Sequence, residues 1–386
     1  VILGEGADKN LEAISAFSAS NIGNYYISNK FAKSKESEIY KAWAWGNYNY
    51  QSKSKKNLLY VKEQKELEFL TFYSDCINFS RDLINSPANK LNPSTYYSKI
   101  KNNNLFKSFN FIDYTEKEIN SNFPLTCAVG KSSSSKPKVI EITNRKLSKK
   151  DKPLVIIGKG VTFDTGGVNI KPGTSMRNMK KDMGGSAIAI SLFLLANYFL
   201  KKTKIVLIAP IAENAISSKS MRPGDVYSSV SGKSVEIAHT DAEGRLLLAD
   251  AIEKASSYNP CMIIDFATLT GAARVALGED LPAYFCNNET FAKKIENLNK
   301  EKLRCWRLPL YSPYLFKIKS QVADLSNASL DGMAGSITAA LFLQEFLKSP
   351  NIPWFHFDTF AWSQDSKGAA LQGLDIMSDF LRKNFN

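Results

Sequence analysis

The pattern of apolar and polar positions divides the chain into a first part with little strand character and a second part of alternating strand-like and helical runs. Residues 1–62 are rich in Asn, Tyr, Ser and Lys, and their clearest element is the helix-like ESEIYKAWAWGNYNY. Apolar residues recur at helical spacing over 61–84, which predicts a long amphipathic helix, and the Pro and Asn content of 85–94 predicts a loop. We therefore predict a short N-terminal domain over 1–62, a linker helix and loop over 63–90, and a larger domain over 91–386.

Beyond about residue 105, short β-rich runs alternate with helical runs. The strand candidates are 124–130, 153–158, 204–210, 234–240 and 261–269. The segments 182–199 and 242–258 between them have helical character. This alternation predicts an α/β fold with a central mixed, largely parallel sheet flanked by helices. The longest apolar run, 186–200, contains Ser and Asn and falls below about 18 continuous apolar positions, which favours a buried helix over a membrane span.

The amino-acid composition bears on the cellular location of the protein and on whether it binds nucleic acid or membranes. The 386 residues are 44% hydrophobic, which is enough for a sizeable core. The net charge is +13, with 23 Lys and Arg against 14 Asp and Glu in the first 150 residues. Such a surface can attract nucleic acid or anionic membranes, but these lysines are dispersed among Asn and Ser, so we expect neither partner. Five widely spaced cysteines without a CxxC pair, and no secretory signal pattern, predict free thiols in the cytoplasm.

Charged residues follow the predicted strands at one edge of the predicted sheet. They are Lys159, Asp164 and Lys171 after the second strand candidate, Asp182 before the apolar helix, and Asp241, Glu243 and Arg245 after the fourth. The segment TLTGA follows the fifth candidate. Because ligands of open α/β sheets collect beyond the carboxyl ends of the strands, we expect these side chains to converge there.

A convergence of three Asp and one Glu implies bound cations. Like charges a few ångströms apart raise each other's pKa values, and divalent cations remove the repulsion. A site rich in oxygen, without Cys and almost without His, suits Mg²⁺, Mn²⁺ or Zn²⁺. Four carboxylates suit two ions that share bridging carboxylates about 3.5–4 Å apart, a common hydrolytic arrangement.

Each of these residues, taken alone, also has a structural interpretation. Asp241 or Asp182 would serve as a helix N-cap, and Glu243 as an acid that the helix dipole favours in the first turn. Arg245 would pair with Glu243, and the two lysines would be solvated. Only the joint occurrence of all of them at one sheet edge favours the metal site.

Several motifs then resemble one family in both sequence and order. HTDAEGRL (239–246) matches seven of eight positions of Asn-Thr-Asp-Ala-Glu-Gly-Arg-Leu, the signature of the leucyl (cytosol) aminopeptidases, which are two-metal exopeptidases. The other matching segments are SRDLINSPAN (80–89), GKGVTFDTGGVNIKP (158–172), MKKDMGG (179–185), FATLTGAARVALG (266–278) and DGMAGSITAALFLQEFL (331–347). The resemblance covers about 80–365 and implies that the larger domain is a catalytic metallopeptidase domain.

The resemblance implies a role for each matching residue. The ligands of the tightly bound ion would be Lys159, Asp164, Asp182 and Glu243. The ligands of the more exchangeable ion would be Asp164, Asp241 and Glu243. Lys171 and Arg245 would be the catalytic residues that bind no metal, with a bicarbonate held by Arg245 as the base. Thr268, Leu269 and Gly271 would align the peptide, and Met179 would line the pocket for its first side chain.

The implied function is removal of the N-terminal residue, Leu or another apolar residue, from peptides with a free N-terminus, using two Mn²⁺ or Zn²⁺ ions per subunit of a homohexamer. Two features depart from the family pattern: His239 replaces the usual Asn, and the N-terminal domain is shorter. The alternatives are a two-metal phosphoesterase, whose sites usually recruit His and Asn, and a basic DNA-binding or scaffold protein with secondary peptidase activity.

Overall fold

The structure is a computed structural model that describes residues 11–20, 24–26, 33–51, 58–300, 302–363 and 368–385. The chain forms two compact units, of which the smaller ends at Asp82 and the larger begins at Leu83. Both residues lie in α3 (Gln64–Asn85), so the amphipathic helix predicted over 61–84 is confirmed. The predicted boundary at residue 62 stays a prediction.

The smaller unit is built from short elements around buried aromatic side chains. They are α1 (Leu11–Ser20), α2 (Lys33–Gly46) and the parallel strands β1 (Asn24–Tyr26) and β2 (Leu58–Tyr60). Arg81 of α3 is buried, with its guanidinium 4.6 Å from the ring of Trp45 and 3.9 Å from that of Tyr48. Its Nη1 donates a hydrogen bond to the Trp45 carbonyl at 2.8 Å, so the buried charge is held by a polar contact and two aromatic faces.

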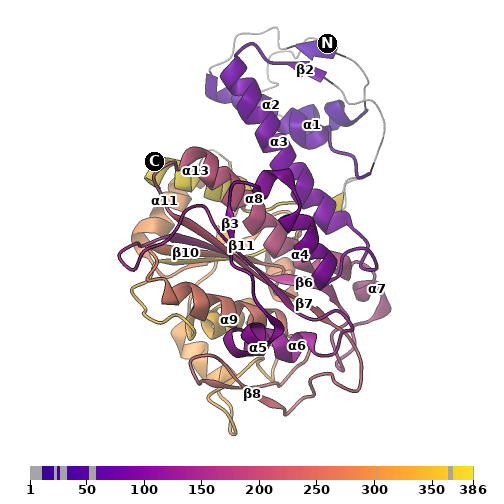
Figure 1. Cartoon of the computed structure of the whole chain (residues 1–386), viewed down its shortest axis with the longest axis vertical. Helices are drawn as coiled ribbons and strands as arrows, with labels where there is room; N and C mark the ends of the chain where they lie inside the picture. The colour runs from indigo at the N-terminus through magenta and orange to yellow at the C-terminus, as the bar shows by residue number, and fades with distance from the viewer. Residues whose placement is uncertain are drawn as a thin grey trace. The chain divides into compact units, whose positions relative to one another are not determined.

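A nine-stranded mixed sheet forms the centre of the larger unit (Figure 1). Its order is β12 (Trp306–Arg307), β11 (Ala283–Cys286), β14 (Trp354–Asp358), β10 (Met262–Ala267), β5 (Leu154–Gly158), β7 (Ile205–Asn214), β4 (Lys138–Thr143) and β3 (Asn110–Phe111). A ninth strand, β6 (Gly160–Asp164), also pairs with β7. Strands β14, β10, β5 and β7 are parallel. Strand β11 runs antiparallel to β14, and β4 runs antiparallel to both β7 and β3, so the predicted mixed, largely parallel sheet is confirmed.

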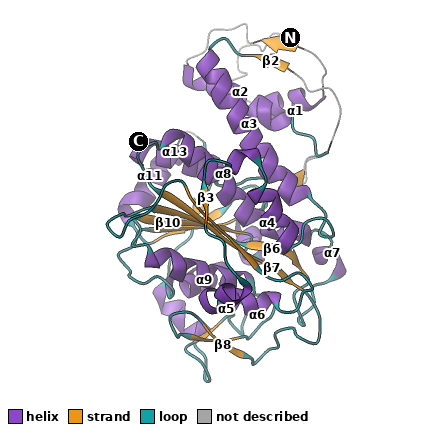
Figure 2. Ribbon diagram, viewed as in Figure 1, coloured by secondary structure: helices purple, strands orange, loops and turns teal. Residues whose placement is uncertain are grey.

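Helices cover both faces of this sheet, as Figure 2 shows. One layer contains α8 (Gly184–Phe199) and α13 (Leu374–Phe385), and the other contains α9 (Gly244–Ser257), α6 (Pro124–Gly130) and α12 (Gly335–Gln344). The remaining helices are α4 (Pro93–Lys101), α5 (Glu116–Asn122), α7 (Gly173–Met176), α10 (Gly271–Leu277), α11 (Glu289–Asn299), and the 3₁₀ turns η2 (Asn104–Phe106), η3 (Met179–Met183) and η4 (Ser312–Ile318). Small sheets are formed by β8 (Val226–Ser228), β9 (Ser234–Glu236) and β13 (Leu325–Ser326), and by β15 (Trp362–Ser363) and β16 (Gly368–Ala369).

The longest apolar segment is a core helix of this fold. The span Met179–Phe199 has the length and composition of a membrane helix, but 83% of its apolar window is buried inside the protein. Every residue from Gly184 to Ala196 of α8 is buried, because this helix packs on β5, β7 and β10 on one side and on α13 on another. The prediction of a buried helix over 186–200 is confirmed.

Two strand predictions are wrong. Residues 124–130 form the helix α6, which begins with Pro at its first position. The buried Thr126 amide in its first turn donates to Asp250 of α9 at 2.7 Å. Of residues 234–240 only Ser234–Glu236 is a strand, and it belongs to the small β13–β9–β8 sheet, not to the central one. The loop after it is held by side-chain hydrogen bonds instead of a strand partner.

Candidate metal centre

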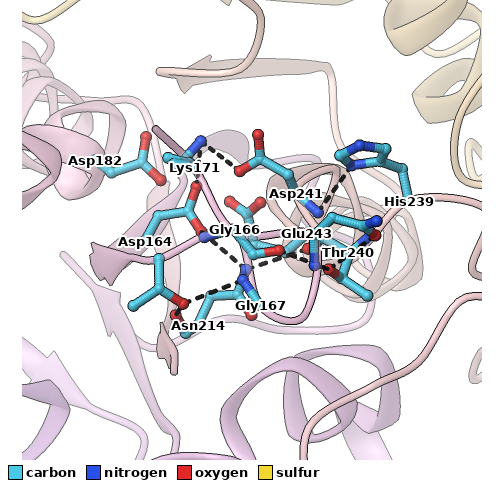
Figure 3. A network of polar contacts seen from close by, with 12 residues as sticks. Asp164, Gly166, Gly167, Lys171, Asp182, Asn214, His239, Thr240, Asp241 and Glu243 are labelled. Atoms are coloured by element: carbon cyan, nitrogen blue, oxygen red, sulfur yellow. Dashed lines mark hydrogen bonds and ion pairs between the residues drawn. The ribbon is translucent and has the colours of Figure 1, made fainter. Parts of the chain in front are cut away.

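Four segments of the chain bring the five predicted ligands to one edge of the central sheet. Lys159 lies between β5 and β6, Asp164 ends β6, and Asp182 belongs to η3. Asp241 and Glu243 lie in the loop that leads into α9. Figure 3 shows Asp164, Asp182, Asp241 and Glu243 with Lys171 between them, so the convergence predicted for this edge occurs.

Three of the carboxylates lie close enough to share a cation. Asp164, Asp241 and Glu243 each place one oxygen within 4.8 Å of the others. The Lys171 ammonium lies 2.8 Å from Asp164 Oδ2 and also contacts Asp241 Oδ1. Oxygen atoms at this spacing, gathered around a positive group, are the donor set that hard or borderline divalent ions prefer.

A second lysine joins the remaining acid to the cluster. Lys159 is 2% exposed, and its Nζ lies 2.7 Å from Asp182 Oδ2 and 3.1 Å from Glu243 Oε1. The same Nζ donates to the Thr268 carbonyl at 2.8 Å. A Cβ at position 244 would lie 2.4 Å from Lys159 Cε, so Gly244 is required for this approach.

Burial and mutual repulsion set the protonation of these acids. Burial and the neighbouring Asp164 raise the pKa of Glu243 to about 8 and that of Asp241 to about 7. Burial alone would also raise the pKa of Asp164, but Lys171 and Lys159 outweigh it and lower that pKa. The pKa of Lys171 is raised, since the attraction of the carboxylates overcomes its own burial. Two ammonium groups therefore do not neutralise the whole cluster, and the site favours additional positive charge.

Side chains outside the cluster fix the orientation of Asp164. Its Oδ1 accepts from the Gly166 amide and from Asn214 Nδ2, both at 2.8 Å. Asn214 also donates to the Thr240 carbonyl at 3.1 Å and so joins β7 to the acidic loop. Gly166 has φ +86°, and a Cβ there would lie 2.4 Å from the Asn169 carbonyl oxygen, so this tight turn requires glycine. The contacts of Asn214 were not predicted from the sequence.

Asn327 fixes the conformation of the loop that carries Asp241 and Glu243 through side-chain hydrogen bonds to its backbone. Its Oδ1 accepts from the amides of Ala238 at 2.8 Å and His239 at 3.1 Å. Its Nδ2 donates to the carbonyls of His239 at 2.8 Å and Ala242 at 3.3 Å. Asn327 is fully buried and follows β13, far along the chain from the loop, and no motif in the sequence pointed to it.

His239 acts as a local turn residue. Its Nδ1 accepts a hydrogen bond from the Asp241 amide at 3.2 Å, two residues along the chain. An asparagine side-chain oxygen makes the same kind of contact in an Asx-turn. The imidazole therefore reproduces the contact that the usual Asn would supply, and Figure 3 shows its ring beside Asp241 and outside the group of carboxylates.

The residues predicted to align a peptide lie on a tightly held loop after β10. Thr268 Oγ1 donates to Asp182 Oδ1 at 2.8 Å. Asp358, at the end of β14, accepts from the amides of Leu269 at 3.2 Å and Thr270 at 3.1 Å. Gly271 is exposed at the start of α10, and Met179 is half-buried at the start of η3.

Arg245 is buried in the first turn of α9 and has unused hydrogen-bonding capacity. It is 7% exposed, and its Nε and Nη1 donate to no partner among the described residues. Burial lowers the pKa of Arg245 to about 10, which still leaves the guanidinium charged at neutral pH. A buried guanidinium with free donors is suited to hold an anion.

The structural interpretations of these residues fail on geometry. Glu243 is the N-cap of α9 but makes no side-chain capping bond, and the N-cap of α8 is Met183, not Asp182. Lys159 and Lys171 have only 3% and 15% of their side chains exposed, so neither is a solvated surface residue. Helix capping by Asp182 or Glu243 and solvation of the two lysines therefore do not account for the cluster.

Fold and site together define an α/β protein with a buried cluster of carboxylates that favours cation binding at the edge of its sheet. The catalytic-domain model of the cytosol aminopeptidase family matches residues 78–377. The chain therefore belongs to the cytosol aminopeptidase family, as the resemblance predicted.

Relatives and solved structures agree with this assignment. The chain is 37% identical over 298 residues to a probable cytosol aminopeptidase of Syntrophotalea carbinolica, which covers 76% of this chain and 59% of that protein. It is 41% identical over 288 residues to a cytosol aminopeptidase of Encephalitozoon cuniculi, covering 73% and 58%. The chain thus spans less than two thirds of the length of these relatives.

Two solved structures share the fold. A cytosol aminopeptidase from Coxiella burnetii has a TM-score of 0.88 and 36% identity, over 97% of this chain and 84% of that one. The bottromycin maturation enzyme BotP, solved in complex with Mn, has a TM-score of 0.86 and 26% identity, over 98% and 87%.

Proposed function

We propose that this protein is a metal-dependent aminopeptidase that removes the N-terminal residue, Leu or another apolar residue, from peptides with a free N-terminus. The observation that carries the proposal is the placement of Asp164, Asp241 and Glu243 within 4.8 Å of one another, next to two buried lysines, in a chain of the cytosol aminopeptidase family. Membership of this family and the absence of His from the group of carboxylates make the phosphoesterase and scaffold alternatives less favoured.

The residues present fit two divalent cations. In the proposed arrangement one ion is held by Lys159, Asp164, Asp182 and Glu243, and the other by Asp164, Asp241 and Glu243. The raised pKa values of Glu243 and Asp241 support this, because each carboxyl would exchange its proton for a cation. Lys159 would bind as a neutral amine, which requires adjacent cations to lower its pKa. BotP is in complex with Mn, which supports Mn²⁺ as one candidate, and Zn²⁺ is the other.

The chain's own residues would position the peptide and stabilise charge. When bound, the two cations supply Lewis acidity that activates water and polarises the scissile carbonyl. Lys171 keeps its proton because of the surrounding carboxylates and would donate hydrogen bonds to the developing oxyanion. Asp182 would attract the positive end of the peptide. Backbone groups of Thr268, Leu269 and Gly271 would align the chain, and Met179 would line the pocket for the first side chain.

Arg245 would hold the anion that acts as the base. In the proposed arrangement every carboxylate of the cluster would be a metal ligand, so none would remain to accept a proton from water. The free Nε and Nη1 donors of Arg245 support a bound bicarbonate, which would take that proton. We therefore assign Lys171 and Arg245 as the catalytic residues of the chain.

The wider assignments follow from the same proposal. A requirement for a free amine explains exopeptidase behaviour, because an internal peptide bond offers no such group. We also propose a homohexamer in the cytoplasm, a short N-terminal domain over 1–62, a linker over 63–90 and a catalytic domain over 91–386. Light scattering of the purified protein tests the hexamer, and a fully active monomer would refute the proposed hexameric assembly.

A panel of aminoacyl nitroanilides tests the activity. The protein is assayed after addition of Mn²⁺ or Zn²⁺ and after treatment with a chelator, on substrates with free and with acetylated N-termini. We expect metal-dependent release of nitroaniline from the free leucyl substrate and none from the acetylated one. Equal rates on both substrates would refute amine recognition, and activity only on a nitrophenyl phosphodiester would favour the phosphoesterase.

A further inference from the structure

Lys181 is a buried lysine that forms no ion pair with the carboxylate cluster. It lies in η3 next to Asp182 and is 4% exposed. Lys159 and Lys171 each contact two carboxylates. Within the part of the chain that the structure describes, the Lys181 ammonium has neither a carboxylate at ion-pair distance nor a hydrogen-bond acceptor. Burial of an unpaired ammonium is unfavourable unless a ligand supplies the opposite charge.

A second cation faces the same aromatic ring. The Lys181 Nζ lies 4.3 Å from the ring centroid of Phe360, and the Arg274 Cζ lies 4.8 Å from it. Arg274 is exposed on α10 and forms no ion pair with the described residues. The face of an aromatic ring attracts cations but does not neutralise them. Two positive groups therefore lie near one half-buried ring, and no carboxylate of the described residues is at ion-pair distance from either of them.

These three residues border the proposed centre. Asp182, adjacent to Lys181, accepts the hydroxyl of Thr268 on the loop that precedes α10. A Cβ at position 184 would lie 2.2 Å from Ala361 Cβ and 3.5 Å from Thr268 Cγ2, so the segment after β14 packs against the same loop. Lys181 and Arg274 thus flank the loop that we propose aligns the peptide.

We infer that Lys181 and Arg274 together bind a carboxylate of the bound peptide, with Phe360 as the platform that holds the two cations in place. This inference rests on the proposed function and specifies its substrate class: peptides with an acidic side chain in one of their first two residues. An apolar first residue beside Met179 is compatible with a carboxylate on the second residue. A carboxylate on the first residue would replace that apolar preference.

Binding of uncleavable peptides tests the inference independently of turnover. The Mn²⁺-loaded protein is titrated calorimetrically with amidated tripeptide analogues whose first bond is reduced, carrying Glu or Gln at the first or the second residue. We expect the Glu analogue to bind at least about tenfold more tightly than its Gln counterpart at one of the two positions, as for a hydrogen-bonded charge pair. In the Lys181→Met, Arg274→Gln double variant this ratio should fall to about one.

Lys180→Met is the matched control. Lys180 is the adjacent lysine, but its Nζ donates to the Asn85 carbonyl at 3.0 Å and lies over Trp362, so the Glu-to-Gln ratio should not change. The single variant Lys181→Met should have an unchanged or higher melting temperature, because it removes an unpaired buried charge. If it fails to fold, the exposed Arg274→Gln variant alone should still reduce the ratio.

Two outcomes would overturn the inference: equal binding of Glu and Gln analogues at both positions, or a ratio that survives in the double variant. Hydrolysis of leucyl nitroanilide separates this failure from failure of the proposed function. If leucyl nitroanilide is hydrolysed but the Glu and Gln analogues bind equally, only the carboxylate-binding site is refuted. If the Glu analogue binds more tightly but no substrate is hydrolysed, the aminopeptidase activity is refuted and the carboxylate-binding site is retained.

Discussion

The central sheet carries two groups of buried acids that differ in the partners that compensate their negative charge. Asp265 on β10 is fully buried, and its two oxygens contact His356 Nδ1 at 2.5 Å and Trp354 Nε1 at 2.6 Å, both from the adjacent strand β14. At the edge of the same sheet, Asp164, Asp241 and Glu243 face one another. The first acid is satisfied by its own neighbours, whereas the second group is satisfied only in part.

The difference separates a structural acid from a ligand-binding one. A buried carboxylate with a complete set of partners holds two strands together and has no capacity for another cation. Burial, together with repulsion from the facing Asp164, raises the pKa of Glu243 to about 8. Burial alone therefore does not identify a functional acid in this protein; the contacts of each oxygen atom do.

Removal of Glu243 should have the largest effect. The Glu243→Ala variant is expected to lose at least one bound ion per subunit and at least about a hundredfold in kcat/KM, because this residue would bridge both ions. It should remain folded, since the substitution also relieves repulsion with Asp164 and Asp241. Metal analysis of the dialysed protein, leucyl nitroanilide kinetics and circular dichroism measure these three effects.

The matched control is Glu253→Ala, on the same helix. The Glu253 side chain accepts hydrogen bonds from Ser229 and Ser231 and, among the described residues, makes none with the cluster. Its loss should leave the ion content unchanged. Two ions per subunit in Glu243→Ala would show that Glu243 is not a bridging ligand.

Removal of Asp265 should have the opposite signature. Asp265→Ala leaves the buried His356 and Trp354 nitrogens without an acceptor and should lower the free energy of unfolding by about 3–5 kcal/mol. The folded fraction should still bind the full complement of ions. Urea denaturation and metal analysis of the same sample test both statements. Loss of ions without loss of stability would show that Asp265 has a metal-binding role and not a structural one.

The sequence predicted the clustered acids better than the residues that support them. Asp164, Asp241 and Glu243 stand in short motifs, and the sequence correctly predicted that they converge, although the strand expected before Asp241 does not belong to the central sheet. Asn327 and Asn214 act through single side-chain amides from distant segments, which leave no pattern in one sequence. Likewise, the apolar run 124–130 reads equally well as a strand or a helix, and the contact with Asp250 that favours the helix is tertiary.

Asn327 should have an intermediate effect that is specific to the cluster. Asn327→Ala removes four hydrogen bonds from the loop that carries Asp241 and Glu243. We expect about tenfold weaker ion binding, which corresponds to the loss of one or two buried hydrogen bonds in the ordering of the loop. Competition with a chromogenic chelator measures the affinity. Asn287→Ala, which removes an amide that contacts Pro350, Ile352 and Trp354, is the control; equal losses in both variants would make the effect a general one.

The two histidines should give the smallest and most direct contrast, because their pKa values shift in opposite directions. Burial alone would lower the pKa of His356, but Asp265 outweighs it and raises that pKa above 6.5. Burial, with Lys171 and Arg245 nearby, lowers the pKa of His239. The chain has only two histidines, so two imidazole signals appear in NMR spectra, and the His239→Asn variant assigns them.

On raising the pH of the ion-free protein, His239 should therefore lose its proton first, below pH 6.5, and His356 later, above it. The His356–Asp265 pair should add stability that is fully present below pH 6.5 and is lost as the pH rises through the folded pKa of His356. His239→Asn should leave ion affinity almost unchanged, since an amide oxygen can accept from the Asp241 amide as Nδ1 does. Titration of both signals at the same pH would show that Asp265 does not hold a charged partner, and the contrast between the two groups of acids would then rest on geometry alone.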